Sequence, residues 1–432
     1  MVNFDAVSLF TNVPTSDACK FGKERFQLDS ILKDRNDLTP DRLHYLLLTY
    51  VTSSGFCWRD KFFERMNVQQ YQRVVDRKTT AIKPVQAKVS SENDGSDIVT
   101  VTTEKPTPVI QKAEALTKAN EPTKCPTSVR HKMLTTPFTR NKFVLHTPIL
   151  AWDEHYSHEE YVRLAQFHGI FGWKSYNEID ISSSLTKLDS PHNRYLFDNR
   201  LVNGKIPDDD KCITCAVIGN GGILKGSKKG KEIDANDYVF RVNTALTKGY
   251  EEDVGSRTSF YCFGMSTLSN TLAGGFETKF RQLPNDEGIR YVFFADGYWA
   301  YTYLASVLHG GKGTVMTNRY PVRFPKKLQA TDIKLVHPDF ERYLKWSWVN
   351  STNQHSRIHR PTTGGIMLLL ALHTCDEVNA YGFGGSYTKF SEHYYDKSFH
   401  KHVDYLNHDT TAENRLWKKL HNLGIINMYT RG

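Results

Sequence analysis

Residues 212–259 constrain the fold of this chain more than any other segment, because they place polar turns directly after two short apolar strands. The first strand is expected over residues 214–218 and is followed by Gly219-Asn-Gly-Gly222. The second is expected over residues 238–242 and is followed by Asn243. Glycines let the backbone approach a ligand closely, and asparagine amides donate and accept hydrogen bonds without adding charge. The segment therefore predicts an α/β site suited to a nucleotide.

Short apolar strands alternate with helix-length segments through the rest of the C-terminal region. Further buried strands are expected over residues 258–262, 291–294, 333–336 and 378–383. The clearest intervening helix is expected over residues 363–375. This alternation predicts a mostly parallel, Rossmann-type sheet with helices on both faces. Ligands of such sheets bind beyond the carboxyl ends of the strands, where the Gly219 turn is expected.

Length and composition indicate a globular chain. With 432 residues, 39% of them hydrophobic and 12% aromatic, the chain has room for two or three domains. It has no apolar run of about 18 residues and no signal-peptide pattern at its N-terminus. We therefore expect neither a membrane anchor nor a visible route into a secretory compartment from the sequence as written.

The formal net charge of +9 leaves a nucleic acid, a membrane surface and an acidic small substrate open as partners. The basic residues are scattered, and the only tight group is Lys225, Lys228, Lys229 and Lys231. This dispersion favours a solvated surface over a nucleic-acid patch, so no nucleic-acid partner is expected. An anionic sugar nucleotide would also be attracted by the positive field.

Composition divides the chain into three regions. Residues 1–77 are mixed and partly helical, whereas residues 78–124 are rich in Thr, Lys, Ser, Pro and Ala and have few aromatics. The second region cannot bury enough apolar surface to order itself, so a disordered stem or linker is expected there. Residues 125–432 are dense in aromatics and alternate strand and helix signals, so they are expected to form the folded α/β domain.

Two turns are candidates for binding an anion. Gly219-Asn-Gly-Gly222 matches neither the dinucleotide fingerprint nor the P-loop, so on its own it is as compatible with a plain tight turn as with a ligand site. Pro361-Thr-Thr-Gly-Gly365 resembles a helix entry whose amides and hydroxyls could hold a phosphate or carboxylate. The alternative is that Thr362 or Thr363 merely caps a core helix.

Two histidines stand out among the seventeen in the chain. His393 lies in Glu392-His-Tyr-Tyr-Asp396, and His408 precedes Glu413 by five residues. A neutral imidazole is well matched to removing a proton from a hydroxyl near physiological pH. An isolated histidine, by contrast, is usually a bystander, and Glu413 is equally compatible with a surface carboxylate.

Four segments resemble, in this order, the large, small, third and very small sequence motifs of the animal sialyltransferases. They are residues 212–259, the helix entry at Pro361, the segment with His393 and the segment with His408. The first segment is most similar to the branch that attaches sialic acid in α-2,6 linkage to O-linked N-acetylgalactosamine. The resemblance implies inverting transfer from CMP-sialic acid to glycoprotein acceptors, on a GT-A-like fold and without a divalent metal. It also implies residence in the Golgi lumen and attachment to its membrane.

The resemblance also assigns roles to residues of this chain. His408 would be the catalytic base, and His393 would lie close to the phosphate of the donor. The nucleotide and donor would be contacted by Asn220, Asn243, Thr362, Thr363 and Gly364. Glu413 would orient the site.

The cysteines are expected to be structural. Cys212 and Cys215 have the spacing of a zinc or thioredoxin motif but lack companion ligands. The resemblance implies a disulfide between Cys215 and Cys375, and we expect a second between Cys125 and Cys212. Asn350-Ser-Thr is a glycosylation sequon if the chain reaches the lumen.

The N-terminal 65 or so residues resemble a different family, the reverse transcriptases of Penelope-like retroelements. Asp5 matches one metal ligand of their palm, but the rest of that polymerase site is missing, so two-metal chemistry cannot be assembled. Two alternatives to the enzyme remain at this point. One is a retroelement-derived nucleic-acid-binding protein, and the other is an inactive relative that only binds glycans.

Overall fold

The computed structural model describes residues 125, 127–206, 211–265, 280, 283–297, 299–310, 328–386 and 388–431. The expected reverse-transcriptase-like segment, residues 1–77, and the expected linker, residues 78–124, lie outside the described residues.

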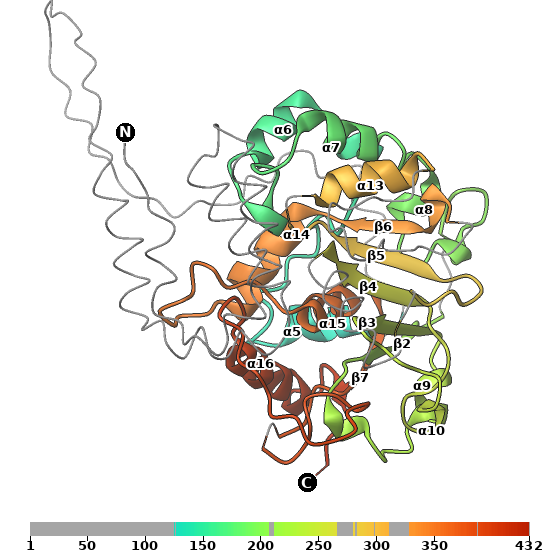
Figure 1. The fold of residues 1–432 in the computed structure, drawn as a ribbon, viewed down its shortest axis with the longest axis vertical. Coiled ribbons are helices and arrows are strands. Elements are labelled where there is room, and N and C mark those ends of the chain that lie inside the picture. The colour runs from blue at the N-terminus through green and yellow to red at the C-terminus, as the bar shows by residue number, and fades with distance from the viewer. Residues whose placement is uncertain are drawn as a thin grey trace, which may run out of the picture. The chain divides into compact units, whose positions relative to one another are not determined.

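The described residues form one eight-stranded sheet in the order β1-β6-β5-β4-β3-β2-β7-β8 (Figure 1). β1 runs antiparallel to β6, and the other six pairings are parallel. The strands are β1 Leu150–Ala151, β2 Thr214–Ile218, β3 Tyr238–Val242, β4 Phe260–Gly264, β5 Arg290–Phe294, β6 Ile333–Val336, β7 Glu377–Tyr381 and β8 Asn427–Met428. The expected mostly parallel sheet is thus confirmed.

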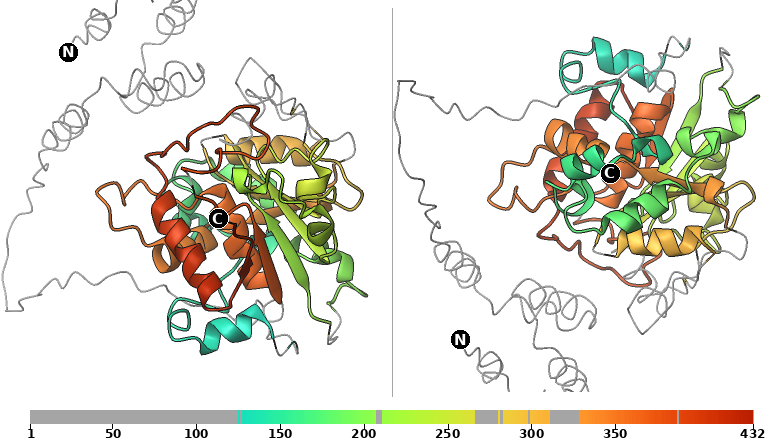
Figure 2. Two further views of the ribbon diagram at one scale, coloured as in Figure 1. Left: turned by 90° about the horizontal axis from the view of Figure 1, so that it is seen from below. Right: turned by 90° about the horizontal axis from the view of Figure 1, so that it is seen from above.

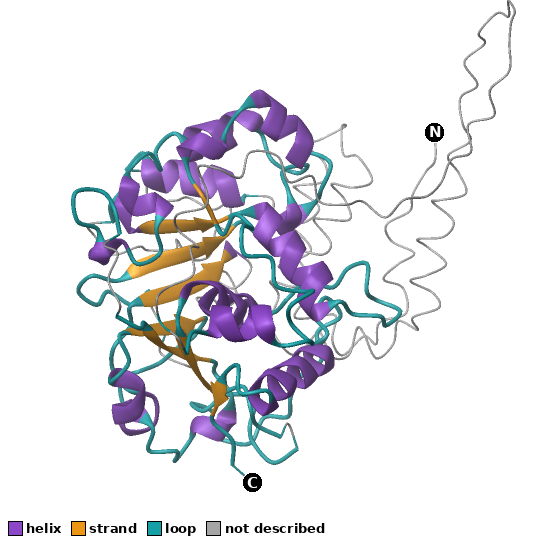
Figure 3. Cartoon of the chain, turned by 180° about the vertical axis from the view of Figure 1, so that it is seen from behind, coloured by secondary structure: helices purple, strands orange, loops and turns teal. Residues whose placement is uncertain are grey.

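Helices surround this sheet, which Figure 3 shows as a central layer. The α-helices are α5 Val129–Thr135, α6 His158–Leu164, α7 Glu178–Leu185, α8 Pro191–Arg194, α9 Gly230–Asp234, α10 Glu251–Val254, α13 Ala300–Leu308, α14 Pro338–Tyr343, α15 Thr363–Thr374 and α16 Thr410–Asn422. The π-helix η8 spans Leu344–Val349, and the 3-10 turns are η3 Asp153–His155, η4 Gly169–Phe171, η5 Asp198–Arg200, η6 Gly222–Leu224 and η7 Ala330–Asp332.

The central strands are buried on both faces, as parallel strands require. Every residue of β3 and β4 is buried. α15 packs on one face against β2, β3, β4 and β7. On the opposite face, Ile233 of α9 and Val254 of α10 pack with Ala216, Ile218 and Val239 in a second hydrophobic cluster. Figure 2 shows the two helical layers on either side of the strands.

Sequence predicted the strands and the core helix to within a few residues. The strand expected over 258–262 spans Phe260–Gly264, and the strand expected over 378–383 ends at Tyr381. β7 ends there because Gly382 adopts a φ of 80°, which turns the chain out of the extended region. The helix expected over 363–375 spans Thr363–Thr374.

The strand order reverses direction between β2 and β7, and the backbones that leave these two strands come very close. The N–H of Gly219 donates to the carbonyl of Tyr381 at 2.8 Å. A Cβ at Gly221 would lie 2.3 Å from the carbonyl oxygen of Gly382, so no other residue fits there without movement. Such a reversal point is where open α/β sheets bind ligands, at the carboxyl ends of the strands.

Both expected disulfides are present. Cys215 of β2 is bonded to Cys375, directly after α15, and Cys125 is bonded to Cys212. The two bonds tie the central helix and the start of the described chain to the same strand. Cys262 in β4 is a free, buried cysteine. Within the part of the chain that the structure describes, no helix has both the length and the apolarity to cross a bilayer.

Candidate active site

The predicted site residues meet at the carboxyl edge of the sheet through a series of direct contacts. The backbone N–H of Tyr394, next to His393, donates to the carbonyl of Asn220 at 2.9 Å. Gly219 and Gly364 both face the ring of Phe383, since a Cβ on either would lie 3.3–3.4 Å from that ring. The turn after β2, the start of α15 and the loop that carries His393 therefore lie next to one another at this edge.

Asn220 and Asn243 each present a buried amide oxygen that has no partner among the described residues. The Asn220 amide nitrogen donates to the carbonyl of Val242 at 3.1 Å, which fixes the side chain. Asn243 has a φ of 55°, and its carbonyl accepts from the hydroxyl of Tyr261 at 2.8 Å. A buried acceptor without a donor costs about 1–3 kcal/mol. The two oxygens are therefore suited to accepting hydrogen bonds from a bound ligand.

Thr362 and Glu413 form the entry of α15. The hydroxyl of Thr362 accepts from the N–H of Gly365 at 2.9 Å, so Thr362 is the N-cap of the helix. The N–H and the hydroxyl of Thr362 each donate to the carboxylate of Glu413 at 2.6 Å. A side chain at Gly365 would collide with this carboxylate, since its Cβ would lie 2.8 Å from Oε2.

Glu413 is 4% exposed, so the alternative that it is a surface carboxylate is wrong. Burial raises its pKa to about 7, although the hydrogen bonds from Thr362 oppose the shift. Thr363, the first residue of α15, is also buried. Glu413 contacts Thr362, which makes it a support of the helix entry.

His408 is held by a hydrogen bond to one ring nitrogen, which leaves the other nitrogen as an acceptor. Nδ1 lies 2.9 Å from the carbonyl oxygen of Arg360. A carbonyl can only accept, so Nδ1 carries the proton and Nε2 keeps its lone pair. Burial, together with the positive charge of Arg360, lowers the pKa of His408 to about 4. The ring is therefore neutral at physiological pH, and no partner of Nε2 lies among the described residues.

His393 lies in the loop that contacts the turn after β2, next to Asp396. Its ring stacks on that of Tyr395, with centroids 4.9 Å apart and an interplanar angle of 7°. Nδ1 lies 3.6 Å from Asp396 Oδ1, and the backbone N–H donates to Oδ2 at 2.8 Å. Although burial opposes the shift, hydrogen bonds from His393 and Ser391 hold the pKa of Asp396 well below its usual range. This carboxylate stays ionised beside the imidazole.

Sequence reasoning missed two charged residues at this edge, Arg360 and Asp296. Their side chains form an ion pair with an N–O distance of 3.1 Å, and Asp296 is 3% exposed. Asp296 follows the strand expected over residues 291–294, so its place at a strand's carboxyl end was a usable signal. Arg360 immediately precedes the helix entry at Pro361.

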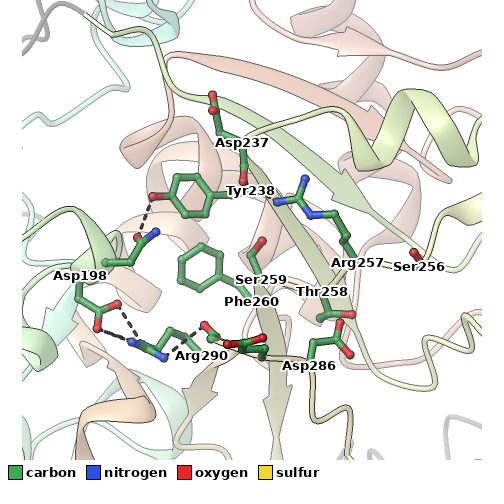
Figure 4. A pocket seen from close by; sticks show the side chains of 13 residues that line it. Asp198, Asp237, Tyr238, Ser256, Arg257, Thr258, Ser259, Phe260, Asp286 and Arg290 are labelled. Carbon is green, nitrogen blue, oxygen red and sulfur yellow. Dashed lines mark hydrogen bonds and ion pairs between the residues drawn. The ribbon is translucent and has the colours of Figure 1, made fainter.

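A cavity of about 460 Å³ lies at the opposite, amino edge of the sheet (Figure 4). It is lined by Asp198, Asn199, Asp237, Tyr238, Ser256, Arg257, Thr258, Ser259, Phe260, Asp286, Glu287, Gly288 and Arg290. Residues 212–259, which were expected to form a single nucleotide site, are thus divided between the two edges of the sheet. The turns at Gly219 and Asn243 follow β2 and β3, but residues 256–259 precede β4 and line this cavity instead.

Several charged side chains of the cavity are held by ion pairs or by hydrogen bonds to the backbone. Asp198 pairs with Arg290 at 2.9 Å and with Lys334 at 3.2 Å. Arg257 donates to the carbonyls of Asp234, Asn236 and Asp237. One carboxylate oxygen of Asp286 is the exception, since it is buried without a partner among the described residues. These pairings indicate a mainly structural role for the amino edge.

The described ranges contain no group of three or more His, Cys, Asp or Glu residues arranged to hold a metal ion.

Two comparisons with known proteins show the family, and a third shows the fold. The family model described as "Glycosyltransferase family 29 (sialyltransferase)" matches residues 150–425. Alpha-N-acetylgalactosaminide alpha-2,6-sialyltransferase 2 of Mus musculus is 40% identical over 301 residues, which are 68% of this chain and 79% of that protein. Alpha-N-acetylgalactosaminide alpha-2,6-sialyltransferase 1 of Homo sapiens is 38% identical over 320 residues, covering 72% of this chain and 52% of that protein.

A solved structure of a mammalian sialyltransferase has the same fold, with a TM-score of 0.50 and 23% sequence identity. The match covers 71% of this chain and 98% of the solved chain. This chain is a member of glycosyltransferase family 29, the sialyltransferases.

Proposed function

We propose that the chain transfers sialic acid from CMP-sialic acid, with inversion, to the 6-hydroxyl of O-linked N-acetylgalactosamine on glycoproteins. The choice of acceptor rests on the names of the relatives, which are 37–40% identical to this chain. The observation that carries the chemistry is His408, whose Nδ1–H is bound by the Arg360 carbonyl while Nε2 is left as an acceptor.

In the proposed reaction, Nε2 of His408 takes the proton of the acceptor 6-hydroxyl while its oxygen attacks the anomeric carbon of the donor. The bond between that carbon and the phosphate oxygen breaks, and CMP leaves with the electron pair. The acceptor approaches from the face opposite the leaving group, which accounts for inversion. A positioned base of this kind contributes about 10²–10⁴-fold to a rate.

The other predicted residues hold the donor. The unpaired oxygens of Asn220 and Asn243 accept hydrogen bonds from the nucleotide. His393 and the start of α15, including Thr363 and Gly364, stabilise the departing phosphate. Thr362 takes part mainly as the N-cap that Glu413 supports.

The proposal extends to the setting of the enzyme. Residues 125–432 are the catalytic domain, with the topology of a GT-A-like fold. Its compartment is the Golgi lumen, where the family implies membrane attachment, and the two disulfides fit an oxidising environment. In that compartment the exposed Asn350, in its Asn-Ser-Thr sequon, carries an N-linked glycan. A mobility shift on treatment with a peptide N-glycosidase, absent in N350Q, is the expected result.

Purified chain incubated with CMP-sialic acid and a peptide carrying O-linked N-acetylgalactosamine tests the reaction directly. We expect release of CMP and a product whose sialic acid is linked to the 6-position, as read by linkage analysis. Failure to transfer to any N-acetylgalactosamine acceptor would contradict the proposal. Retained binding of glycan or of nucleic acid would then choose between the two alternative functions.

A further inference from the structure

Arg360 contacts the loop of the catalytic base through its main chain. Its N–H donates to the carbonyl of Asn407 at 2.9 Å, and its own carbonyl accepts from Nδ1 of His408 at 2.9 Å. Two adjacent hydrogen bonds therefore join residue 360 to residues 407 and 408. The position and tautomer of the His408 ring depend on where the backbone of Arg360 lies.

The side chain of Arg360 is anchored on a different element. Its guanidinium pairs with Asp296 at 3.1 Å, directly beyond the carboxyl end of β5. Asp296 packs directly against Gly264. A Cβ at position 264 would lie 2.3 Å from Oδ1 of Asp296, so a residue other than glycine there would collide with this carboxylate. The side chains of this pair are only 18% and 4% exposed, so the ion pair is shielded from solvent.

We propose that Arg360 is a positioning residue for sialyl transfer, whose ion pair with Asp296 fixes the carbonyl that orients His408. The inference rests on the proposed function, because it assigns a role in the same reaction. It joins β5, at the middle of the sheet, to the His408 loop that precedes α16, although these segments are more than a hundred residues apart in the sequence.

The surrounding charges support this role. Glu341, another buried carboxyl group near Arg360, is 2% exposed, and burial raises its pKa to about 8, which favours its neutral form. Asp296 is thus the anion that Arg360 pairs with among the described residues. Around His408, the ring of Tyr405 lies 6.3 Å away, and the charges of Arg360 and His359 both lower its pKa. Asp409 instead binds Ser351 and Asn353.

Arg360 therefore acts on His408 in two separable ways, through geometry and through charge. Removing both, in R360M, displaces the carbonyl and raises the pKa of His408 toward its ordinary value. Because the base must be neutral, the acidic limb of the pH profile of kcat then moves to higher pH. R360K keeps the positive charge but loses the planar fork, so kcat falls while the acidic limb stays in place. D296N keeps Arg360 and removes its anchor.

The experiment measures kcat, KM and the pH profile of sialyl transfer for wild type, R360M, R360K and D296N. We expect kcat of R360M to fall by about 10–100-fold with little change in KM, the scale of a small misplacement of a catalytic group. R360K and D296N should lose less and show no upward shift of the acidic limb. R357M is the matched control, because Arg357 lies in the same loop with an exposed side chain that forms no ion pair among the described residues.

The outcomes separate this inference from the proposed function. A wild type that transfers no sialic acid defeats the proposed function. A wild type that does transfer, with R360M and D296N matching its kcat and pH profile, overturns the role of Arg360. A histidine NMR titration reads the pKa of His408 without turnover: an unchanged value in folded R360M also overturns it. If R360M does not fold, R360K and D296N decide the question.

Discussion

The two edges of the sheet differ in whether their polar side chains have partners. At the carboxyl edge, the amide oxygens of Asn220 and Asn243 are buried without partners among the described residues, and Nε2 of His408 is left as an acceptor. At the amino edge, Asp198 pairs with Arg290 (Figure 4) and with Lys334, and Arg257 is held by three backbone carbonyls. Buried polar groups without partners reduce stability but remain available to a ligand. Paired groups stabilise the fold but are not available to a ligand.

This comparison predicts that changes at the carboxyl edge alter turnover and leave the melting temperature unchanged. Changes at the amino edge should lower the melting temperature while the folded protein keeps its turnover. Each of the following variants tests one side of that division, beginning with the largest expected effect.

His408→Ala should lower kcat by about 10²–10⁴-fold, because it removes the base without touching the core. The measurement is sialyl transfer at saturating donor and acceptor, together with the melting temperature. His131→Ala is the control, since His131 lies exposed on α5 and should leave both quantities unchanged. Near-normal turnover of the His408 variant would rule out its role as base.

Asp198→Ala should destabilise the fold by about 3–5 kcal/mol, because it leaves a buried cation unpaired. The side chain of Lys334 is fully buried and that of Asp198 is 2% exposed. Chemical denaturation measures the loss, and kcat of the protein that remains folded should match wild type. Glu252→Ala breaks the exposed pair with Lys228 and should cost less than about 1 kcal/mol. Equal costs for the two variants would contradict the proposed difference between buried and exposed pairs.

Asn243→Ala should raise KM for the donor by about 5–150-fold, which corresponds to the 1–3 kcal/mol of one buried hydrogen bond. The stability should fall only by the cost of placing alanine at a φ of 55°, about 1–2 kcal/mol, because the unpaired oxygen contributes nothing to the free protein. Donor titrations at fixed acceptor test this, with Asn353→Ala, which removes an exposed amide, as the control. A marked loss of stability would place Asn243 among the structural residues.

Glu413→Gln tests a residue that lies at the carboxyl edge but supports the fold, and we expect its effect on stability to be the smallest of these effects. The pKa of Glu413 is raised by burial to about 7, so its contribution to stability is full below its unfolded pKa, near 4.5, and is lost as pH rises to 7. The melting temperature of wild type should therefore fall more steeply than that of the variant between these pH values. Identical slopes would show that the carboxyl group ionises normally.

Local sequence was enough to predict the elements that bear the site. Apolar strands that end in glycine or asparagine predicted β2, β3 and the turns after them, since both signals lie within a few residues of chain. For Thr362, the sequence before the apolar helix left an anion site and a helix cap as alternatives, and the structure forms the cap. The disulfide between Cys215 and Cys375 was inferred from family resemblance, and the one between Cys125 and Cys212 was expected as a second pair; both are present.

Other features have no local signal. Glu413 was as compatible with a surface position as with a site role, and only its contact with the start of α15 shows it to be buried. The ion pair of Arg360 with Asp296 joins residues 64 positions apart in the numbering, and neither residue stands in a recognisable motif of its own.

The sequence by itself determined the family, the parallel sheet and the residues expected to carry out the reaction, because these depend on short patterns that survive in the linear chain. Only the tertiary structure decided which of the polar residues are paired. Residues 256–259 belong to the same sequence motif as Gly219. They precede β4, whereas Gly219 follows β2, so they line the opposite edge of the sheet. Pairing and burial depend on contacts between distant segments, and these exist only once the sheet has brought them together.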